Sequence, residues 1–509
     1  MALDSHIFTI VEPKIKLDSM NTPNLAERES GDAVSSFQGG VAPYIKINNY
    51  TFQPDAIDSF ILDLNGKYPE VRAKILDSQN VFTVDQFPRD GDILSLRIEL
   101  DKSGTYKDIR MDFTILEFRG TPSTSLDKKS GASSYSVRAI AKIPGMYTDE
   151  CKSYGSNNSL EHVKLIAGDL KLGVSTNVNS TSDEMTRFCA YQTKLEFLEN
   201  TVMYSYVSDN SFQTFSIDPY YYISFVDLQR VFNAPNDIEL GDFITGQMFN
   251  ERGIDPTTGA GEEKTPLILT NHHNMKGSNT EILRYNLVNN STKIALENGY
   301  KRKMQYFDQG VFEEGLIEFD IESMVSDNMS DREEALKGRR NSEVDEYGTH
   351  IKQKYVGIQN TNSHLNYNYA AINNIQNMVE LDKLYLEVEL STVNPAIYKY
   401  MKLPVSIYNY GHTNAVVSTN LSKEIKKAEF ELKSEEDNFG KDTETDEKDN
   451  MPPKFTLDEF LTAHYVVMGI KYKYLPKTGY TQVLKLARRE WPARLSNVWY
   501  ILNGRRTEK

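Results

Sequence analysis

FTLDEFLTAHYVVMGIKYKYLPKTGYTQVLKLARREWP, residues 455–492, contains two alternating runs separated by one turn. In the first run, Ala463 to Tyr474, one face carries His464, Val466, Met468, Ile470, Tyr472 and Tyr474, and the other carries Tyr465, Val467, Gly469, Lys471 and Lys473. A period of two is typical of a β-strand. Residues 475–479 contain a proline and a glycine, which favour a turn, and alternation resumes from Thr481 to Arg488. The segment is therefore predicted to form an antiparallel β-hairpin.

Length and composition predict a globular chain of several domains. The 509 residues exceed the ~100 to 200 of one domain, so three or four domains are expected. With 39% hydrophobic and 25% charged residues the chain has enough apolar side chains for a core, and no apolar run approaches the ~20 residues that span a bilayer. The first residues lack a basic region followed by an apolar stretch and a cleavage site, so export by a signal peptide is not expected.

Charge and cysteine content narrow the possible partners. A net charge of −15 argues against binding nucleic acid by phosphate neutralisation. It is compatible with a passage through which DNA moves without sticking, or with an acidic surface that only confers solubility. Two cysteines exclude a disulfide framework and fit a reducing compartment, while 30 tyrosines favour strands and protein interfaces.

Patterns in the first half predict three segments. Residues 1–40 are polar and are interpreted as an arm or linker, and residues 41–148 as a first β-barrel domain. The barrel prediction rests on short strand-like runs at 44–52, 57–64, 71–76, 93–100, 109–118 and 136–143. Residues 149–230 are predicted to be a small α/β module.

Two helices and two strands make up the predicted module. The first helix has a capping pair, Asn158 and Glu161, an apolar face at Leu160, Val163, Ile166, Ala167 and Leu170, and Gly173 as its expected left-handed C-cap. A second helix is expected at about 192–206. Strands are expected at 212–217 and 220–226, on either side of Asp218-Pro219.

The second half is predicted to be β-rich. Residues 231–379 are interpreted as part of a second barrel with an inserted module, ending in a short helix at 369–379. Residues 380–492 complete that barrel, with strands at 383–390 and 405–408. They enclose an acidic segment at 431–453 that is interpreted as a mobile loop, and the sequence does not decide whether this loop binds an ion or a partner. Residues 493–509 form a tail. No repeat of fixed period is visible in the sequence.

The candidate motifs for a metal or phosphate site are incomplete. His272-His273 lacks further ligands at a workable spacing, so a surface pair is the better interpretation. Residues 259–265 resemble a phosphate loop, but two glutamates and Pro266 argue against one. Residues 442–446 space carboxylates as calcium loops do without the turn glycine or the terminal glutamate. No metal, cofactor or cofactor-binding residue is therefore predicted.

Motifs for covalent or acid–base catalysis are equally weak. Residues 131–135 lack the second glycine of a nucleophile elbow. Cys151 and Cys189 are better read as packing residues than as nucleophiles, and among 72 acidic residues some pair fits a glycosidase geometry by chance. No catalytic residue is predicted, and the chain is not expected to be an enzyme.

Several motifs, in their order along the chain, resemble baseplate hub proteins of contractile-tailed phages, which are related to type VI secretion spike hubs. They are the helix with A-x-D-L-x-L-G at Ala167–Gly173, the segments 192–198, 206–212 and 218–222, and the terminal hairpin with its Y-V-V-x-G-I-x-Y strand. The resemblance covers the middle and the C-terminal end, whereas the first barrel and residues 231–400 match only in pattern.

The resemblance implies a fold and a function. The fold is β-rich α+β, with two tail-tube-like β-barrel domains and inserted α/β modules. The function is a virion baseplate hub assembled in the host cytoplasm: a homotrimer whose six barrels join a sixfold tail tube to a threefold central spike, contact baseplate wedge proteins and leave a channel for DNA ejection. The alternatives are a tail-associated cell-wall hydrolase, which needs a catalytic constellation not found here, and a secretion-system spike hub, which usually carries a β-helical needle on the same chain.

Overall fold

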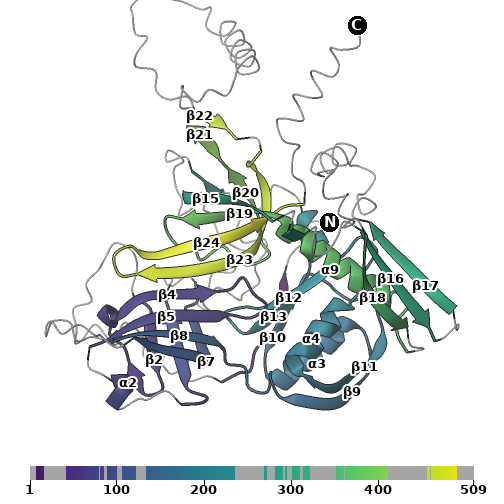
Figure 1. The fold of residues 1–509 in the computed structure, drawn as a ribbon, viewed down its shortest axis with the longest axis horizontal. Coiled ribbons are helices and arrows are strands. Elements are labelled where there is room, and N and C mark those ends of the chain that lie inside the picture. The colour runs from purple at the N-terminus through teal and green to yellow at the C-terminus, as the bar shows by residue number, and fades with distance from the viewer. Residues whose placement is uncertain are drawn as a thin grey trace, which may run out of the picture.

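The computed structural model describes residues 7–16, 42–78, 81–84, 89–99, 106–121, 133–234, 269–271, 281–290, 293–294, 301–309, 313–320, 351–359, 362–410, 455–458 and 460–489. Strands predominate, and a curled thirteen-stranded sheet occupies one side of the molecule, with the longer helices beside it (Figure 1). The prediction of a β-rich α+β fold is confirmed. Within these residues, no helix is both long and apolar enough to cross a membrane.

The N-terminal half of the large sheet contains seven strands. They are β2 (Tyr44–Ile47), β3 (Tyr50–Thr51), β4 (Ile57–Asp63), β5 (Glu70–Asp77), β6 (Ile93–Ile98), β7 (Ile109–Thr121) and β8 (Ser133–Ala141), with the short helices η3 (Pro54–Ala56) and α2 (Val81–Val84) between them. Their order in the sheet is β4-β5-β8-β7-β6-β2-β3, and every neighbouring pair is antiparallel. Alternate side chains of β5 are buried, as the sequence pattern predicts.

The C-terminal half of the sheet contains six strands. They are β14 (Leu269–Thr270), β15 (Ile282–Asn289), β19 (Leu384–Leu390), β20 (Lys402–Ser406), β23 (Ala463–Leu475) and β24 (Gly479–Ala487). The order is β15-β19-β24-β23, with β20 on the first part of β23 and β14 on β20. A separate pair, β21 (Tyr408–Tyr410) and β22 (Phe455–Leu457), follows β20.

The two halves of the sheet have the same topology. In chain order β4, β5, β6, β7 and β8 correspond to β15, β19, β20, β23 and β24, because the spatial orders β4-β5-β8-β7-β6 and β15-β19-β24-β23-β20 are identical. Both β7 and β23 contain 13 residues, and both β8 and β24 contain 9. The chain therefore carries two copies of one β half-barrel, a repeat that the sequence does not reveal.

Two β-bulges recur at corresponding strands and fix the residue-by-residue match. Asp58 and Leu283 are the extra residues near the starts of β4 and β15, and Leu116 and Met468 are the extra residues within β7 and β23. A bulge places two residues opposite one on the neighbouring strand. Counting from either bulge gives the same register. Residues that lie side by side across β4, β5, β8 and β7 are Leu62, Val71, Ala139 and Ile115, and their counterparts across β15, β19, β24 and β23 are Leu287, Leu386, Leu486 and Val467.

The bulge at Met468 changes the predicted faces of the terminal hairpin. The hairpin itself is present, with β23 and β24 paired from Val466–Ala487 to Leu475–Gly479. The prediction of a single uninterrupted alternation is wrong, because one extra residue exchanges the faces. Consequently Tyr465 and Val467 face the main core together with Ile470 and Tyr472, whereas Val466 and Met468 pack on the other side, in a second cluster beneath the α/β module.

The α/β module lies beside the N-terminal half-barrel (Figure 1). Its four-stranded sheet has the order β1-β10-β13-β12, made of β1 (Phe8–Val11), β10 (Gly173–Thr176), β13 (Tyr222–Asp227) and β12 (Gln213–Ile217). A two-stranded sheet of β9 (Asp149–Asn157) and β11 (Met185–Thr193) accompanies it. The interpretation of residues 1–40 as an arm or linker is wrong for the described part, because β1 pairs antiparallel with β10.

The helices of the module are α3 (Ser159–Leu170), α4 (Lys194–Met203) and α5 (Leu228–Phe232). The predicted cap of α3 is confirmed: the Asn158 side chain accepts a hydrogen bond from the Glu161 amide, and the predicted apolar face is buried. The C-cap prediction is wrong, because Lys171 adopts the left-handed conformation at φ 59°. Gly173 instead begins β10, where a Cβ would lie 2.4 Å from the Tyr222 ring and 2.8 Å from the Val11 carbonyl oxygen.

Helix α9 (Tyr367–Lys383) joins the module to a three-stranded sheet of β17 (Glu313–Asp320), β16 (Lys301–Asp308) and β18 (Ile351–Gln359). Its buried face carries amides, including Asn373, Asn374 and Asn377. The Asn374 amide nitrogen donates to the carbonyls at the end of α4, those of Met203 and Ser205 at 2.9 Å, and its oxygen accepts from the Gln213 amide at 2.9 Å. Helix α9 is therefore held by hydrogen bonds in addition to apolar packing.

Candidate assembly surface

The two half-barrels are joined by direct strand pairing. Residues 471–474 of β23 pair antiparallel with residues 60–63 of β4, so the two sheets become one. Leu62 and Tyr472 are opposite each other and are 0% and 3% exposed. At the next pair the Lys471 ammonium lies 3.5 Å from the Asp63 carboxylate. The junction thus buries apolar side chains on the core side and carries an ion pair at the outer positions.

A lysine from the C-terminal half-barrel caps the turn that follows β4. The Lys399 ammonium donates to the carbonyls of Leu64 at 3.1 Å and Gly66 at 2.7 Å. Burial lowers the pKa of Lys399 to about 7, a direction that nearby Lys485 reinforces and Asp63 opposes. The Leu64 amide also donates to the Ile470 carbonyl at 2.8 Å. Three backbone groups of one turn are therefore held by the other half-barrel.

Gly469 permits the close approach of that turn. A Cβ at Gly469 would lie 2.1 Å from Asn65 Oδ1, 2.7 Å from Asn65 Cγ and 3.0 Å from Asn65 Cα. No L-residue with a side chain fits there without movement of the turn. The glycine in the Y-V-V-x-G-I-x-Y strand is thus explained by the junction between the two half-barrels.

A tyrosine-rich turn fastens the module to the N-terminal half-barrel. Asp218 accepts hydrogen bonds from the amides of Tyr220 and Tyr222, both at 2.9 Å. The Tyr221 hydroxyl accepts from the Asp112 amide at 2.9 Å on β7, and Tyr221 takes φ 65°, which is unusual for a residue with a side chain. Burial raises the pKa of Asp218 to about 7. The segment 218–222, which carries part of the sequence resemblance, is a connector between domains.

Asp183, Ser159 and Arg187 form a buried polar cluster in the module, and their hydrogen bonds hold the backbone in place. Asp183, which is 0% exposed, accepts from the Ser159 amide at 2.9 Å and the Tyr206 amide at 3.0 Å, and Arg187 donates to Ser159 Oγ at 2.7 Å. His162 lies nearby, but its Nε2 is 3.1 Å from the Met185 carbonyl, and burial lowers its pKa to about 4. Ser159 is thus bonded to a carboxylate and a guanidinium with no imidazole as a general base.

Candidate catalytic and metal positions are not brought together. Cys151 is exposed and Cys189 is buried, and burial raises the pKa of the Cys189 thiol, which disfavours a thiolate nucleophile. Across the residues described above, no group of three or more His, Cys, Asp or Glu is placed to hold a metal. The His272-His273 pair, the segment 259–265, the acidic loop 431–453 and the tail 493–509 lie outside the described residues.

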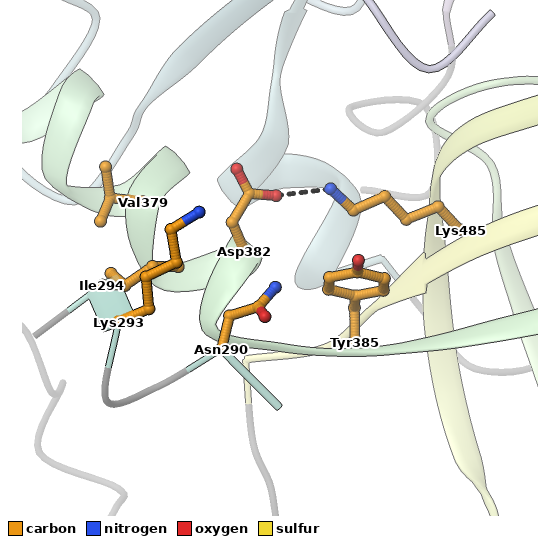
Figure 2. A pocket seen from close by; sticks show the side chains of 7 residues that line it. All are labelled: Asn290, Lys293, Ile294, Val379, Asp382, Tyr385 and Lys485. Atoms are coloured by element: carbon orange, nitrogen blue, oxygen red, sulfur yellow. Dashed lines mark hydrogen bonds and ion pairs between the residues drawn. The ribbon is translucent and has the colours of Figure 1, made fainter. Parts of the chain in front are cut away.

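A pocket of about 370 Å³ lies at the C-terminal end of α9 and is lined by residues of α9, β19, β24 and the segment that follows β15 (Figure 2). The Lys485 ammonium lies 2.6 Å from the Asp382 carboxylate and 4.6 Å from the centre of the Tyr385 ring. Asn290 and Lys293 line the side of the pocket next to the end of β15. The pocket therefore borders the strand that corresponds to β4.

No protein-family model matches the chain, and no curated protein sequence matches it. Among solved structures, it is similar to a tail protein from Neisseria meningitidis MC58, with a TM-score of 0.43 and 9% identity over 88% of this chain and 97% of that one. It is also similar to the 43 kDa tail protein of prophage MuSo2 from Shewanella oneidensis, with a TM-score of 0.44 and 8% identity over 88% and 98%. A type VI secretion component from E. coli gives a TM-score of 0.38 and 8% identity over 88% and 78%.

Proposed function

We propose that this chain is a structural protein of a phage tail, a baseplate hub that assembles as a homotrimeric ring. The observation that carries the proposal is the pair of half-barrels with one topology, joined edge to edge within a single chain. A unit that contains two equivalent modules in sequence can close into a ring with twice as many modules as chains. Three chains would present six half-barrels to a sixfold tail tube and keep threefold symmetry toward a central spike.

The ordered sequence motifs support the same function. The motif helix is α3, the tyrosine turn 218–222 connects two domains, and the terminal hairpin forms the junction between the half-barrels. The tyrosine turn and the terminal hairpin therefore both position domains, which is what a structural hub requires. The net charge of −15 suits a channel that passes DNA without retaining it. Baseplate wedge proteins, the tube protein and the spike protein are the expected partners, in a virion assembled in the host cytoplasm.

The mass of the purified protein in solution tests the proposal. Sedimentation or light scattering at micromolar concentration should give three times the mass of one chain, and negative-stain images should show a three-lobed ring with a central hole. A monomer that also fails to associate with tube or spike subunits contradicts the proposal. A cell-wall hydrolase would instead clear a peptidoglycan zymogram, which we expect to remain uncleared.

A further inference from the structure

The internal junction between the half-barrels has a counterpart at the two free edges of the sheet. Within the chain, the end of β23 pairs with β4. In the repeat, β23 corresponds to β7 and β4 corresponds to β15. Among the described strands, β15 pairs along its length only with β19, and residues 117–121 of β7 pair only with β8. The same two edges that meet inside the chain are thus available at its two ends.

Burial at corresponding positions indicates that a neighbour is missing at β15. Leu62 in β4 is 0% exposed because β23 covers it, whereas its counterpart Leu287 in β15 is 42% exposed. Phe60 is likewise 0% exposed, and its counterpart Tyr285 is only partly buried. A half-barrel that buries these positions in one copy and exposes them in the other lacks a strand at the second copy.

We infer that β15 of one copy pairs antiparallel with residues 119–121 of β7 in the next copy, in the register of the internal junction. This inference rests on the proposed ring and specifies its contact between chains. The internal pairs Lys471–Asp63 and Tyr472–Leu62 correspond to Arg119–Val288 and Gly120–Leu287. Leu287 then enters the core of the ring, as Leu62 enters the core of the chain.

The same register places a second contact at the pocket in Figure 2, between side chains of other types than in the internal junction. Lys399, three residues before β20, reaches the turn after β4. Its counterpart is Asp90, three residues before β6, in the exposed turn at residues 89–91. The turn after β15 contains Asn290, and the pocket there also contains Lys293. The next copy therefore brings the Asp90 carboxylate to a pocket in which the Asp382 carboxylate is already paired with Lys485 and the Lys293 ammonium is the further group of opposite charge.

Disulfide trapping tests the register directly. In a Cys151→Ser background, Arg119→Cys combined with Val288→Cys should give covalently closed oligomers on mild oxidation, seen as a ladder ending at the trimer on a non-reducing gel. A mixture of the two single variants should give covalent dimers and nothing larger. The matched positive control is Asp63→Cys with Lys471→Cys, which should cross-link within one chain and leave its apparent mass unchanged, because opposite residues lie within disulfide range.

A second cysteine pair, shifted by two residues along β15, shows whether cross-linking depends on the exact register or only on the two strands being close. Arg119→Cys with Asn286→Cys displaces the pairing by two residues and should cross-link at least tenfold more slowly. A trimer in solution that does not cross-link through Arg119 and Val288, while the internal control does, overturns this contact but leaves the proposed ring intact. A monomer at micromolar concentration overturns both.

Charge exchange tests the contribution of the pocket. Lys293→Glu and Asp90→Lys should each weaken assembly several-fold in a dilution series followed by mass photometry, and the double variant should recover most of the loss. Leu287→Asp should abolish assembly with an unchanged circular dichroism spectrum, whereas Leu165→Asp, at a position of similar exposure on α3 (46%), should assemble normally. Additive losses in the charge pair, or normal assembly of Leu287→Asp, contradict the inference.

Discussion

Replacing Gly469 by alanine should weaken the junction between the half-barrels. The added Cβ would lie 2.1 Å from Asn65 Oδ1, which the Asn65 side chain could relieve by rotating, and 3.0 Å from Asn65 Cα, which only a backbone shift can relieve. That backbone is held by the bond from the Leu64 amide to the Ile470 carbonyl and by the Lys399 ammonium. Overpacking of this kind costs about 1–3 kcal/mol, offset by roughly 0.5–1 kcal/mol from replacing a strand glycine.

A double-mutant cycle identifies the cause of that loss. Asn65 Oδ1 is buried and has no hydrogen-bond partner among the described residues, so Asn65→Ala alone should be neutral or slightly stabilising. Combined with Gly469→Ala it should recover the part of the loss that comes from Oδ1 and Cγ, and leave the part that comes from Cα, which alanine retains. The assay is urea denaturation followed by tyrosine fluorescence, supported by proteolysis of the junction. Equal losses in the single and double variants, or an unaffected Gly469→Ala protein, would refute the steric explanation.

Three further predictions concern the α/β module. Asn374→Leu should destabilise the protein by about 2–5 kcal/mol in urea denaturation, because carbonyls of α4 and the Gln213 amide lose their buried partner; Tyr369→Phe, which removes a more exposed bond to the Asp209 carbonyl, is the control and should cost under about 1 kcal/mol. The pKa of Asp218 is raised from 3.8 to about 7 by burial, so its contribution to stability is complete below pH ~4 and is lost as the pH rises through about 7. Asp218→Asn should therefore gain stability relative to wild type between pH 4.5 and 7.5. A difference in unfolding free energy between the two proteins that stays constant over this range would contradict the prediction. The pKa of His162 is lowered from 6.5 to about 4 by burial, so wild type should lose stability as the pH falls from 6.5 to 4; His162→Gln retains a donor for the Met185 carbonyl and should lose less over that range, as urea midpoints at the two pH values will show.

Local features of the fold were predictable where one element determines its own pattern. The cap of α3 depends on Asn158 and Glu161 alone, and the terminal hairpin depends on alternation and a turn. The bulge at Met468 was not predictable, because the two clusters that receive Val467 and Met468 come from distant parts of the chain. Helix α9 runs to Lys383, four residues beyond its predicted end. The burial of its amides was not predictable, because Asn373 and Asn374 look solvent-facing in sequence and find their partners in α4 and in the segment 211–213.

The candidate assembly surface was only partly visible in the sequence. The terminal hairpin and the tyrosine turn were singled out as motifs, and both prove to lie at contacts between domains. The repeat itself was hidden because corresponding residues share burial and not identity: Leu94 and Leu403 match, but Phe113 corresponds to Tyr465 and Leu96 to Val405, all at most 1% exposed. Core positions tolerate such exchanges when volume and pattern are kept, whereas the register of strands and bulges cannot change without turning every side chain to the other face.

The repeat also explains why the two ends of the sheet differ from its middle. At the internal junction both partners are on one chain, so Asp63 and Lys471 form an ion pair and Lys399 caps the facing turn. At the free edges the corresponding residues are Val288, Arg119 and Asp90, and the apolar Leu287 is exposed. An exposed leucine on an edge strand promotes indiscriminate pairing unless something restricts its partners. An acidic turn that must meet Lys293 would provide such a restriction, because strand pairing in a wrong register would leave Asp90 without its ammonium partner. The β15 edge therefore combines a non-selective apolar contact with a selective charged one, and the two contributions can be separated by salt: raising the ionic strength should reduce the effect of Lys293→Glu and leave that of Leu287→Asp unchanged.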